Sequence, residues 1–410
     1  MTRKDLKLVR SAFLLIILIS VVVINVRLRS QPEIKVERND TINVEVLTQL
    51  RGLKNALGNG ADADMQRVYP EGYVFMNALY ALAWTNFIAH LPKDSEYFKE
   101  GYFEISNASH RINSRGGRST FIEIDSANFG AFYSGWNNYV LAKKLSLLDN
   151  SERDPADVLR FLKQSENIAA SFEKSVYPVS YPGSAWPADA VVCMASLALY
   201  DKMFEPLYTR HINRWISKVR KNCDSRGFIP HAAESVTGKV TEEARGSSMS
   251  LMLIFLNDID QALALEQYKD YRAHFVDEHF DLAFIREYPK GSSGSGDIDS
   301  GPVFFGIGSA ATLAGMHTLA LYNDSYSAAK IRNQVEAFGF PFTSDGKKNF
   351  LFGKLPIADA FITWGYTAQN LSHHHAADFL TIHVCSLVVI ILLAIAIRWL
   401  WKPRSARIHK

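Results

Sequence analysis

The sequence predicts an all-α protein in which six helical hairpins form an (α/α)6 toroid with a transmembrane helix at each end. The first observation is a loop followed by an apolar helix, repeated six times between residues 71 and 370 at intervals of 55 to 60 residues. A repeat of this length marks a supersecondary unit that buries its apolar face only against its neighbours. The second observation is that these helices are apolar on every side, which is typical of an interior position. The third is a long apolar segment near each end of the chain.

The two terminal segments are predicted to anchor the protein in a membrane, so the lipid bilayer is an expected partner. Residues 12–26 are expected to form a transmembrane signal-anchor because no small-residue cleavage site follows them; a cleaved signal peptide is the alternative. Residues 379–397 have the length of a transmembrane helix. Four bases in the tail 1–11 and five in the tail 398–410 predict that both tails are cytoplasmic. The domain between them is then extracytoplasmic, either periplasmic or extracellular.

Residues 27–59 are expected to form a linker and a leading amphipathic helix, and residues 60–372 the toroid. In each hairpin, the apolar helix is expected inside the ring and the following amphipathic helix outside it. The predicted helices of the toroid are 71–91 with 95–113, 130–148 with 154–175, 186–204 with 207–223, 245–260 with 263–280, 301–322 with 325–338, and a last inner helix at 355–371.

Composition narrows the possible functions. Without the two tails the chain carries 36 basic and 41 acidic residues, so nucleic acid is not an expected partner. Three cysteines are too few for a disulfide framework, although a bond between Cys193 and Cys223 stays open. No phosphate-binding glycine loop, nucleophile elbow or zinc signature occurs, so no cofactor and no metal is expected. The sequence leaves the oligomeric state open.

Five side chains that can transfer protons fall in the loops before the apolar helices or in their first turns. They are Glu71, Asp189, His231, Asp297 and Asp299. In a ring of hairpins these positions meet at one mouth, where burial beside aromatic rings raises the pKa of a carboxyl group, as a general acid requires. Glu71 is expected to be the acid, and Asp297 or Asp299 the base. Helix capping and first-turn placement are the structural alternatives for the carboxylates.

Aromatic and polar side chains near the same mouth are predicted to bind the substrate, with Trp186 and Tyr133 as a stacking platform. The full predicted set is Tyr133, Trp136, Asn137, Trp186, Arg286, Glu287, Tyr288 and Trp364. A local ion pair that holds the loop is the alternative for Arg286 and Glu287, and core packing is the alternative for the aromatic residues.

Three segments resemble known families. PEGYVFMNALYALA, which contains Glu71, looks like the first inner helix of six-hairpin glycosidases, although Phe75–Asn77 stands where those enzymes have Tyr-Gly-Met. That resemblance implies Glu71 as the general acid. YPGSAWPADAVVCMASLALYD and EYPKGSSGSGDIDSGPVFFGIGSA are similar to bacterial membrane-linked proteins with a linalool dehydratase/isomerase-like toroid. That second resemblance implies the same fold but protonation and dehydration of a terpenoid alcohol.

The leading expectation is a membrane-anchored extracytoplasmic enzyme that processes an envelope or extracellular glycan by carboxylate acid/base chemistry. The first alternative is a terpenoid dehydratase or isomerase, which requires a closed apolar pocket and is favoured by Cys193 lying within reach of the acids. The second alternative is a non-catalytic binding or assembly protein of the cell envelope, whose ring mouth lacks convergent carboxyl groups. The expected ligand is accordingly a glycan or an apolar small molecule.

Overall fold

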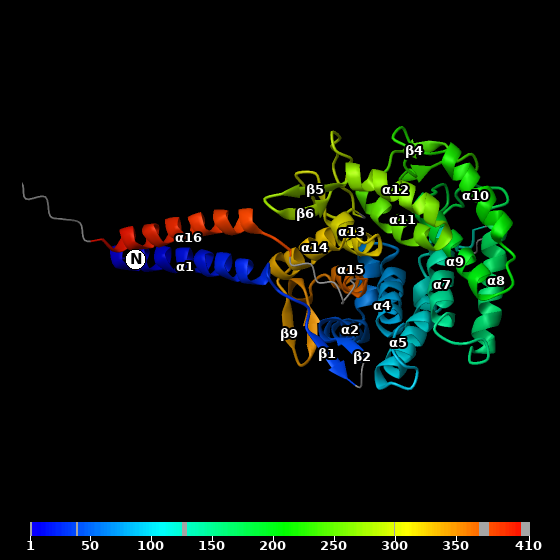
Figure 1. Ribbon diagram of the computed structural model, residues 1–410, viewed down its shortest axis with the longest axis horizontal. Helices are drawn as coiled ribbons and strands as arrows, with labels where there is room; N and C mark the ends of the chain where they lie inside the picture. Colours follow the sequence, from blue (N-terminus) through cyan, green and yellow to red (C-terminus); the bar gives the residue numbers. More distant parts are fainter. Residues whose placement is uncertain (1, 38–39, 125–128, 299, 369–376, 403–410) are drawn as a thin grey trace, which may run out of the picture.

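The computed structural model of the protein describes residues 2–37, 40–124, 129–298, 300–368 and 377–402. Sixteen α-helices and five two-stranded antiparallel sheets occur in this part of the chain. The predicted predominance of helices is therefore confirmed. Figure 1 shows one helical domain from which α1 and α16 leave together.

Six apolar helices occupy the centre of the domain and contact one another in a closed series. α4 packs against α7, α7 against α9, α9 against α11, α11 against α13, α13 against α15, and α15 against α4. Most of their residues are buried, as expected for helices that are apolar on every side. The helices are α4 (Gly72–Ile88), α7 (Gly130–Leu145), α9 (Pro187–Met203), α11 (Gly246–Ile259), α13 (Ser309–Leu321) and α15 (Pro356–Thr367).

Six further helices each pack against one of the apolar helices: α5 on α4, α8 on α7, α10 on α9, α12 on α11, α14 on α13, and α2 on α15. The sixth pair thus joins a helix near the start of the domain to one near its end. The helices are α2 (Val44–Gly58), α5 (Glu96–Ile112), α8 (Pro155–Ser171), α10 (Thr209–Lys221), α12 (Gln261–His274) and α14 (Ser325–Phe338), with the short α3 (Ala61–Val68) and α6 (Arg115–Arg118) beside them.

Local sequence signals explain where these partner helices begin. The Asp154 carboxylate accepts a hydrogen bond of 2.9 Å from the Ala156 N–H at the start of α8. Pro155 takes the first helical position, where no intrahelical hydrogen bond is lost. A buried ion pair of 2.7 Å between Lys144 and Asp157 then fixes α8 to α7.

Two predicted helices are partly wrong, because their ends form β-hairpins. Helix 263–280 stops at His274, and the chain turns back through Phe280 and Asp281, which both have positive φ. Helix 301–322 starts only at Ser309. The strands, including those in the predicted linker, are β1 (Ile34–Glu37) with β2 (Asp40–Asn43), β3 (Ala232–Ala233) with β4 (Val240–Glu242), β5 (Val276–His279) with β6 (Leu282–Ile285), β7 (Val303–Phe304) with β8 (Ile307–Gly308), and β9 (Phe342–Ser344) with β10 (Lys347–Asn349).

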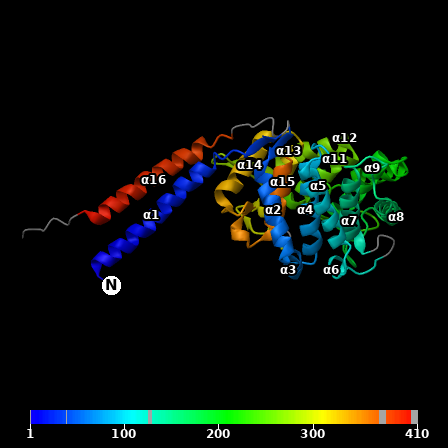
Figure 2. The same ribbon diagram turned by 90° about the horizontal axis from the view of Figure 1, so that it is seen from below.

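The terminal helices α1 (Arg3–Arg27) and α16 (Leu380–Trp401) are each long and apolar enough to cross a membrane. α1 is longer than the predicted span of residues 12–26 and begins at Arg3. Thr2 and Asp5 form a capping box that starts the helix well before the apolar segment. α1 and α16 contact each other, and Trp401 Nε1 donates to Ser11 Oγ at 2.8 Å, at the end far from the domain (Figure 2). The first half of α1 and the end of α16 therefore lie together at the end of the helix pair that is far from the domain.

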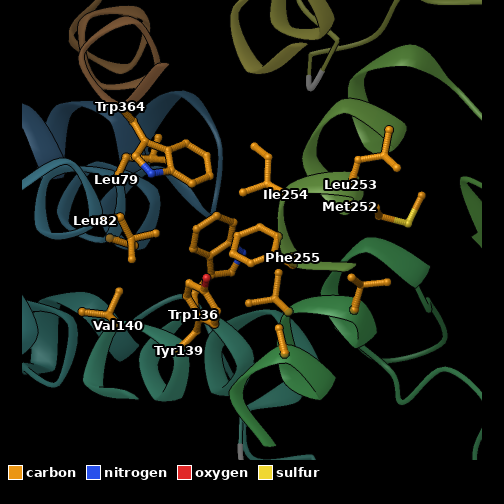
Figure 3. Packing of buried hydrophobic residues seen from close by; sticks show 14 of the residues in the cluster. Leu79, Leu82, Trp136, Tyr139, Val140, Met252, Leu253, Ile254, Phe255 and Trp364 are labelled. Carbon is orange, nitrogen blue, oxygen red and sulfur yellow. The ribbon is translucent and has the colours of Figure 1, made fainter. Parts of the chain in front are cut away.

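Aliphatic and aromatic side chains together fill the core between the apolar helices (Figure 3). Trp136 and Phe255 are fully buried and meet edge to face with ring centroids 5.3 Å apart. Tyr139 meets Phe255 in the same way at 4.8 Å, and Trp364 packs on the other side of it at 6.1 Å. Aromatic contacts of this kind hold three different helices, α7, α11 and α15, in fixed positions.

Candidate active site

A cavity of about 700 Å³ lies at the N-terminal ends of the six apolar helices. Each of those helices contributes a residue from its first turn or its cap. These residues are Glu71, Phe132, Trp186, Ser247, Ser309 and Leu355. The location agrees with the prediction that the loops before the apolar helices meet at one mouth.

The helix ends around this cavity lack side-chain caps. Within the described residues, the N-cap side chain of none of the six apolar helices forms a hydrogen bond to the first turn. Five of the six partner helices do have one. The apolar helices direct the positive ends of their dipoles toward the cavity, where they stabilise carboxylates or a polar ligand.

Glu71 lies at the N-terminal end of α4 on the cavity wall. The Tyr181 hydroxyl donates a hydrogen bond to its Oε1. The Tyr181 ring in turn meets Trp186 edge to face at 5.9 Å, and both rings line the cavity. The Glu71 carboxylate is thus held by one ring of an aromatic pair on the cavity wall.

Asp189, in the first turn of α9, lines the same cavity and is only 9% exposed. It accepts a hydrogen bond from Ser180 Oγ, so one short loop, Ser180–Tyr181, orients both Asp189 and Glu71. Cys193, one turn further along α9, is buried and donates to the Ala131 carbonyl at 3.3 Å. The Cys193 side chain does not line the cavity, and both it and Cys223 are free thiols.

His231 reaches the cavity from the loop before β3 and is 9% exposed. Its Nδ1 lies 3.0 Å from Ser248 Oγ, and its Nε2 lies 4.0 Å from a Glu242 carboxylate oxygen. Burial and the neighbouring Arg245 charge lower the pKa of His231 to about 4, against a smaller opposing effect of Glu242. At neutral pH, His231 is therefore an uncharged imidazole.

Asp297 also lines the cavity and forms an ion pair with Arg245, which also binds Glu242. Burial disfavours the Asp297 carboxylate, but the Ser300 N–H, at 2.9 Å, and the Arg245 guanidinium outweigh that effect and lower its pKa. Asp297 is thus a stable anion. Asp299, the other predicted base, lies outside the described residues.

Glu287 stands directly behind the cavity wall and is fully buried. It accepts hydrogen bonds from the Ser247 hydroxyl at 2.7 Å and the Ser247 N–H at 3.3 Å. Burial raises the pKa of Glu287 to about 7, although Ser247 and Arg245 oppose the rise. Glu287 was predicted to touch substrate; it contacts Ser247 instead, and Ser247 faces the cavity.

Six other predicted substrate-binding residues do not line the cavity, because each is engaged in packing or in local hydrogen bonds. Tyr133 donates its hydroxyl to the Ile112 carbonyl at 3.1 Å, and Asn137 pairs with Asn113. Trp136 lies one layer below, against Phe75 and Phe132, which do line the cavity. The proposed platform of Trp186 and Tyr133 is therefore wrong for Tyr133, and Tyr181 takes the place beside Trp186.

Arg286 and Tyr288 hold the loop that follows β6. Arg286 Nη1 lies 3.2 Å from Asp277 Oδ2, and the Tyr288 hydroxyl donates to the Ser295 carbonyl at 2.7 Å. Trp364 faces a separate hollow of about 310 Å³ at the opposite ends of the apolar helices, where its ring lies 4.3 Å from that of His317. All three have the structural roles that were the alternatives to substrate binding.

Most of the cavity surface is hydrocarbon. Its apolar lining consists of Val68, Phe75, Phe132, Leu251, Ile298, Val303, Leu313, Leu355, Ile357 and Phe361, with several alanines and a proline. Among the residues described, no group of three His, Cys, Asp or Glu side chains could hold a metal ion. A few convergent polar groups in an otherwise apolar hollow are typical of a small-molecule site.

The sequence singled out Glu71, Asp189, His231, Asp297 and Trp186, and the structure brings them to one cavity. The sequence did not reveal the residues that position them, above all Tyr181, Ser180 and Ser248. Their only sequence signal was membership of the Tyr-Pro-rich and Ser-rich loops before apolar helices.

Comparison with models of known protein families gives no match, and comparison with curated protein sequences gives none either.

Proposed function

We propose that this protein is a membrane-anchored acid/base enzyme that cleaves or rearranges a C–O bond in an uncharged, largely apolar substrate. The observation that carries the proposal is the placement of Glu71, Asp189 and Asp297 on the wall of one mainly hydrocarbon cavity. Three carboxyl groups against one guanidinium disfavour an anionic substrate and favour a transition state with positive charge. The resemblance to linalool dehydratase/isomerase-like proteins points to the same substrate class.

The architecture in this proposal is an (α/α)6 toroid. Its support is the closed series of contacts among the six apolar helices, each with one partner helix. In the proposed topology α1 and α16 cross the membrane, both tails are cytoplasmic and the domain lies outside. Trypsin added to spheroplasts should then cut at the exposed Lys290 and leave both tails intact. Protection of Lys290 together with loss of the tails would reverse the orientation.

The proposed reaction begins with proton transfer from Glu71 to the substrate oxygen. The C–O bond breaks as the proton arrives, its electron pair stays with the oxygen, and water or an alcohol leaves. Positive charge develops on the carbon and is stabilised by the carboxylates of Asp189 and Asp297. Transfer of a proton from the adjacent carbon to Asp189 gives an alkene. Addition of water to the carbon, with transfer of a water proton to Asp189, gives an alcohol instead.

Glycan processing is the second candidate, and one observation favours it. Tyr181 and Trp186 form a perpendicular aromatic pair beside Glu71, an arrangement able to stack on a sugar ring next to the acid. Hydrolysis of a glycoside starts with the same protonation of a leaving oxygen. The hydrocarbon on the remaining walls is the reason for placing the apolar substrate first.

A substrate panel separates the candidates. The full chain, reconstituted in phospholipid nanodiscs, is incubated with terpenoid and polyprenyl alcohols and, separately, with envelope glycans, and products are identified by mass spectrometry. Ala188→Trp fills the cavity and should abolish turnover. Ala156→Trp is the matched control, because Ala156 also follows a proline at a helix start but is exposed.

The proposal is supported if the wild type and Ala156→Trp convert apolar alcohols and Ala188→Trp does not. Conversion of glycans alone, with the same pattern in the variants, moves the function to the second candidate. Ligand binding to the cavity without any conversion would leave the third interpretation, a binding or assembly protein.

A further inference from the structure

A group of exposed apolar side chains, here called the apolar rim, lies on the segment between α14 and α15. Its members are Phe338, Phe340, Phe342, Leu351, Phe352 and Leu355, which are between 36% and 69% exposed. The segment includes the β9–β10 hairpin and the short helical turn η1 (Leu351–Gly353). A concentration of large exposed apolar side chains on one short surface segment indicates a surface that binds an apolar partner.

The conformation of the rim supports a binding role and not core packing. Phe340 and Phe352 stack on each other at 5.7 Å while both remain more than half exposed. Phe340, Leu351 and Phe352 all have positive φ, which is unfavourable for residues with large side chains. The chain thus holds these side chains outward in a strained backbone although no described neighbour buries them.

The rim lies where the terminal helices meet the domain. Ala337, next to Phe338, packs with Leu28 at the end of α1 and Phe379 just before α16. At the β5–β6 turn, the Asp281 carboxylate accepts a hydrogen bond from the Thr381 N–H in the first turn of α16, and the adjacent Phe280 is 66% exposed. Figure 1 shows β9 on the side of the domain from which α1 and α16 leave.

The rim also leads into the cavity. Leu355 belongs to both, since it is 42% exposed and lines the cavity. Ile357 and Phe361, on the next turns of α15, continue the apolar wall inward. An apolar path therefore runs from the surface beside the terminal helices to the carboxylates.

We propose that the apolar rim sits in the lipid bilayer that holds α1 and α16, and that the substrate enters the cavity from the bilayer. The substrate class is then an amphiphile whose hydrocarbon part partitions into the membrane. The bilayer part of this proposal rests on geometry alone, whereas the entry of a substrate rests on the proposed function. The exposed Lys354 beside the rim suits contact with anionic headgroups.

The test uses a photo-crosslinking benzophenone amino acid at three positions, one per protein, in full chains reconstituted in phosphatidylcholine and phosphatidylglycerol nanodiscs. Phe352 reports on the rim, Phe361 on the cavity, and Phe103 on α5 is the control, since it is 61% exposed and remote from the rim in sequence. After irradiation, mass spectrometry identifies phospholipid bound to each position. A polyprenyl alcohol added to the nanodiscs is the probe for entry into the cavity.

We expect phospholipid on position 352 at a yield at least five-fold above position 103, and the polyprenyl alcohol on position 361. Equal yields at 352 and 103 would overturn the bilayer contact. Lipid on 352 without polyprenyl alcohol on 361 would overturn the entry route. Glu71→Gln should leave both crosslinks unchanged even if it stops turnover, so failure of the chemistry and failure of the membrane route can be distinguished.

Discussion

Glu287→Gln tests the electrostatics behind the cavity wall. The carboxyl group of Glu287 is fully buried, and burial raises its pKa from 4.5 to about 7. The folded protein therefore binds this proton more tightly than the unfolded chain does. The stabilisation is complete below about pH 4.5 and is lost as pH rises through 7, and the pKa change corresponds to about 3 kcal/mol. Gln cannot ionise but keeps an oxygen that accepts the Ser247 hydrogen bond.

The measurement is the thermal midpoint of the purified full chain in detergent at pH 5 and at pH 8. Relative to wild type, Glu287→Gln should gain about 2.5 kcal/mol between the two pH values, roughly 3 °C in the midpoint for a chain of this size. Asp359, whose pKa burial also raises to about 7, affects both proteins equally. Exposed Glu96→Gln is the control and should gain nothing. The same difference between wild type and Glu287→Gln at both pH values would refute the reasoning.

Two further predictions concern packing. Gly246→Ala places a methyl group 1.8 Å from the Arg286 carbonyl oxygen at the start of α11, so the midpoint should fall by the equivalent of about 1–3 kcal/mol. Gly58→Ala, with open space around it, is the control, and an equal effect at both sites would contradict the close contact. Phe255→Ala removes the ring between Trp136 and Trp364 and should cost about 3–5 kcal/mol, measured by the same assay. A loss below about 1 kcal/mol would show that this core is not tightly packed.

The sequence was most informative where periodicity is strong. The start of α7 at Gly130 and the whole of α14 (Ser325–Phe338) fall at their predicted positions, because a regular alternation of apolar and amphipathic helices sets them. The β-hairpins were missed because their strands have two to four residues, too few for a period to show. The early start of α1 was missed for a different reason, since a capping box extends the helix beyond its apolar part.

For the site, position along the chain was a better guide than residue type. Glu71, Asp189 and Asp297 reach one cavity because each lies near the N-terminal end of an apolar helix or in the loop before one. Tyr133, Trp136 and Asn137 were attractive by composition, but they lie on buried surfaces of α7, which sequence spacing could not separate from the cavity surface. Nor could the sequence show that Tyr181 would hold Glu71, because that contact spans 110 residues.

Turnover by Glu71→Gln is the measurement that tests the central claim most directly. Glu71 carries the transferred proton in the proposed reaction, and Gln has nearly the same shape but no acidic proton. With the substrate found in the panel, Glu71→Gln in nanodiscs should lower kcat at least 100-fold while KM changes less than three-fold, and Glu96→Gln should match wild type. A Glu71→Gln protein that keeps wild-type kcat would contradict the proposal that this carboxyl group performs the acid step.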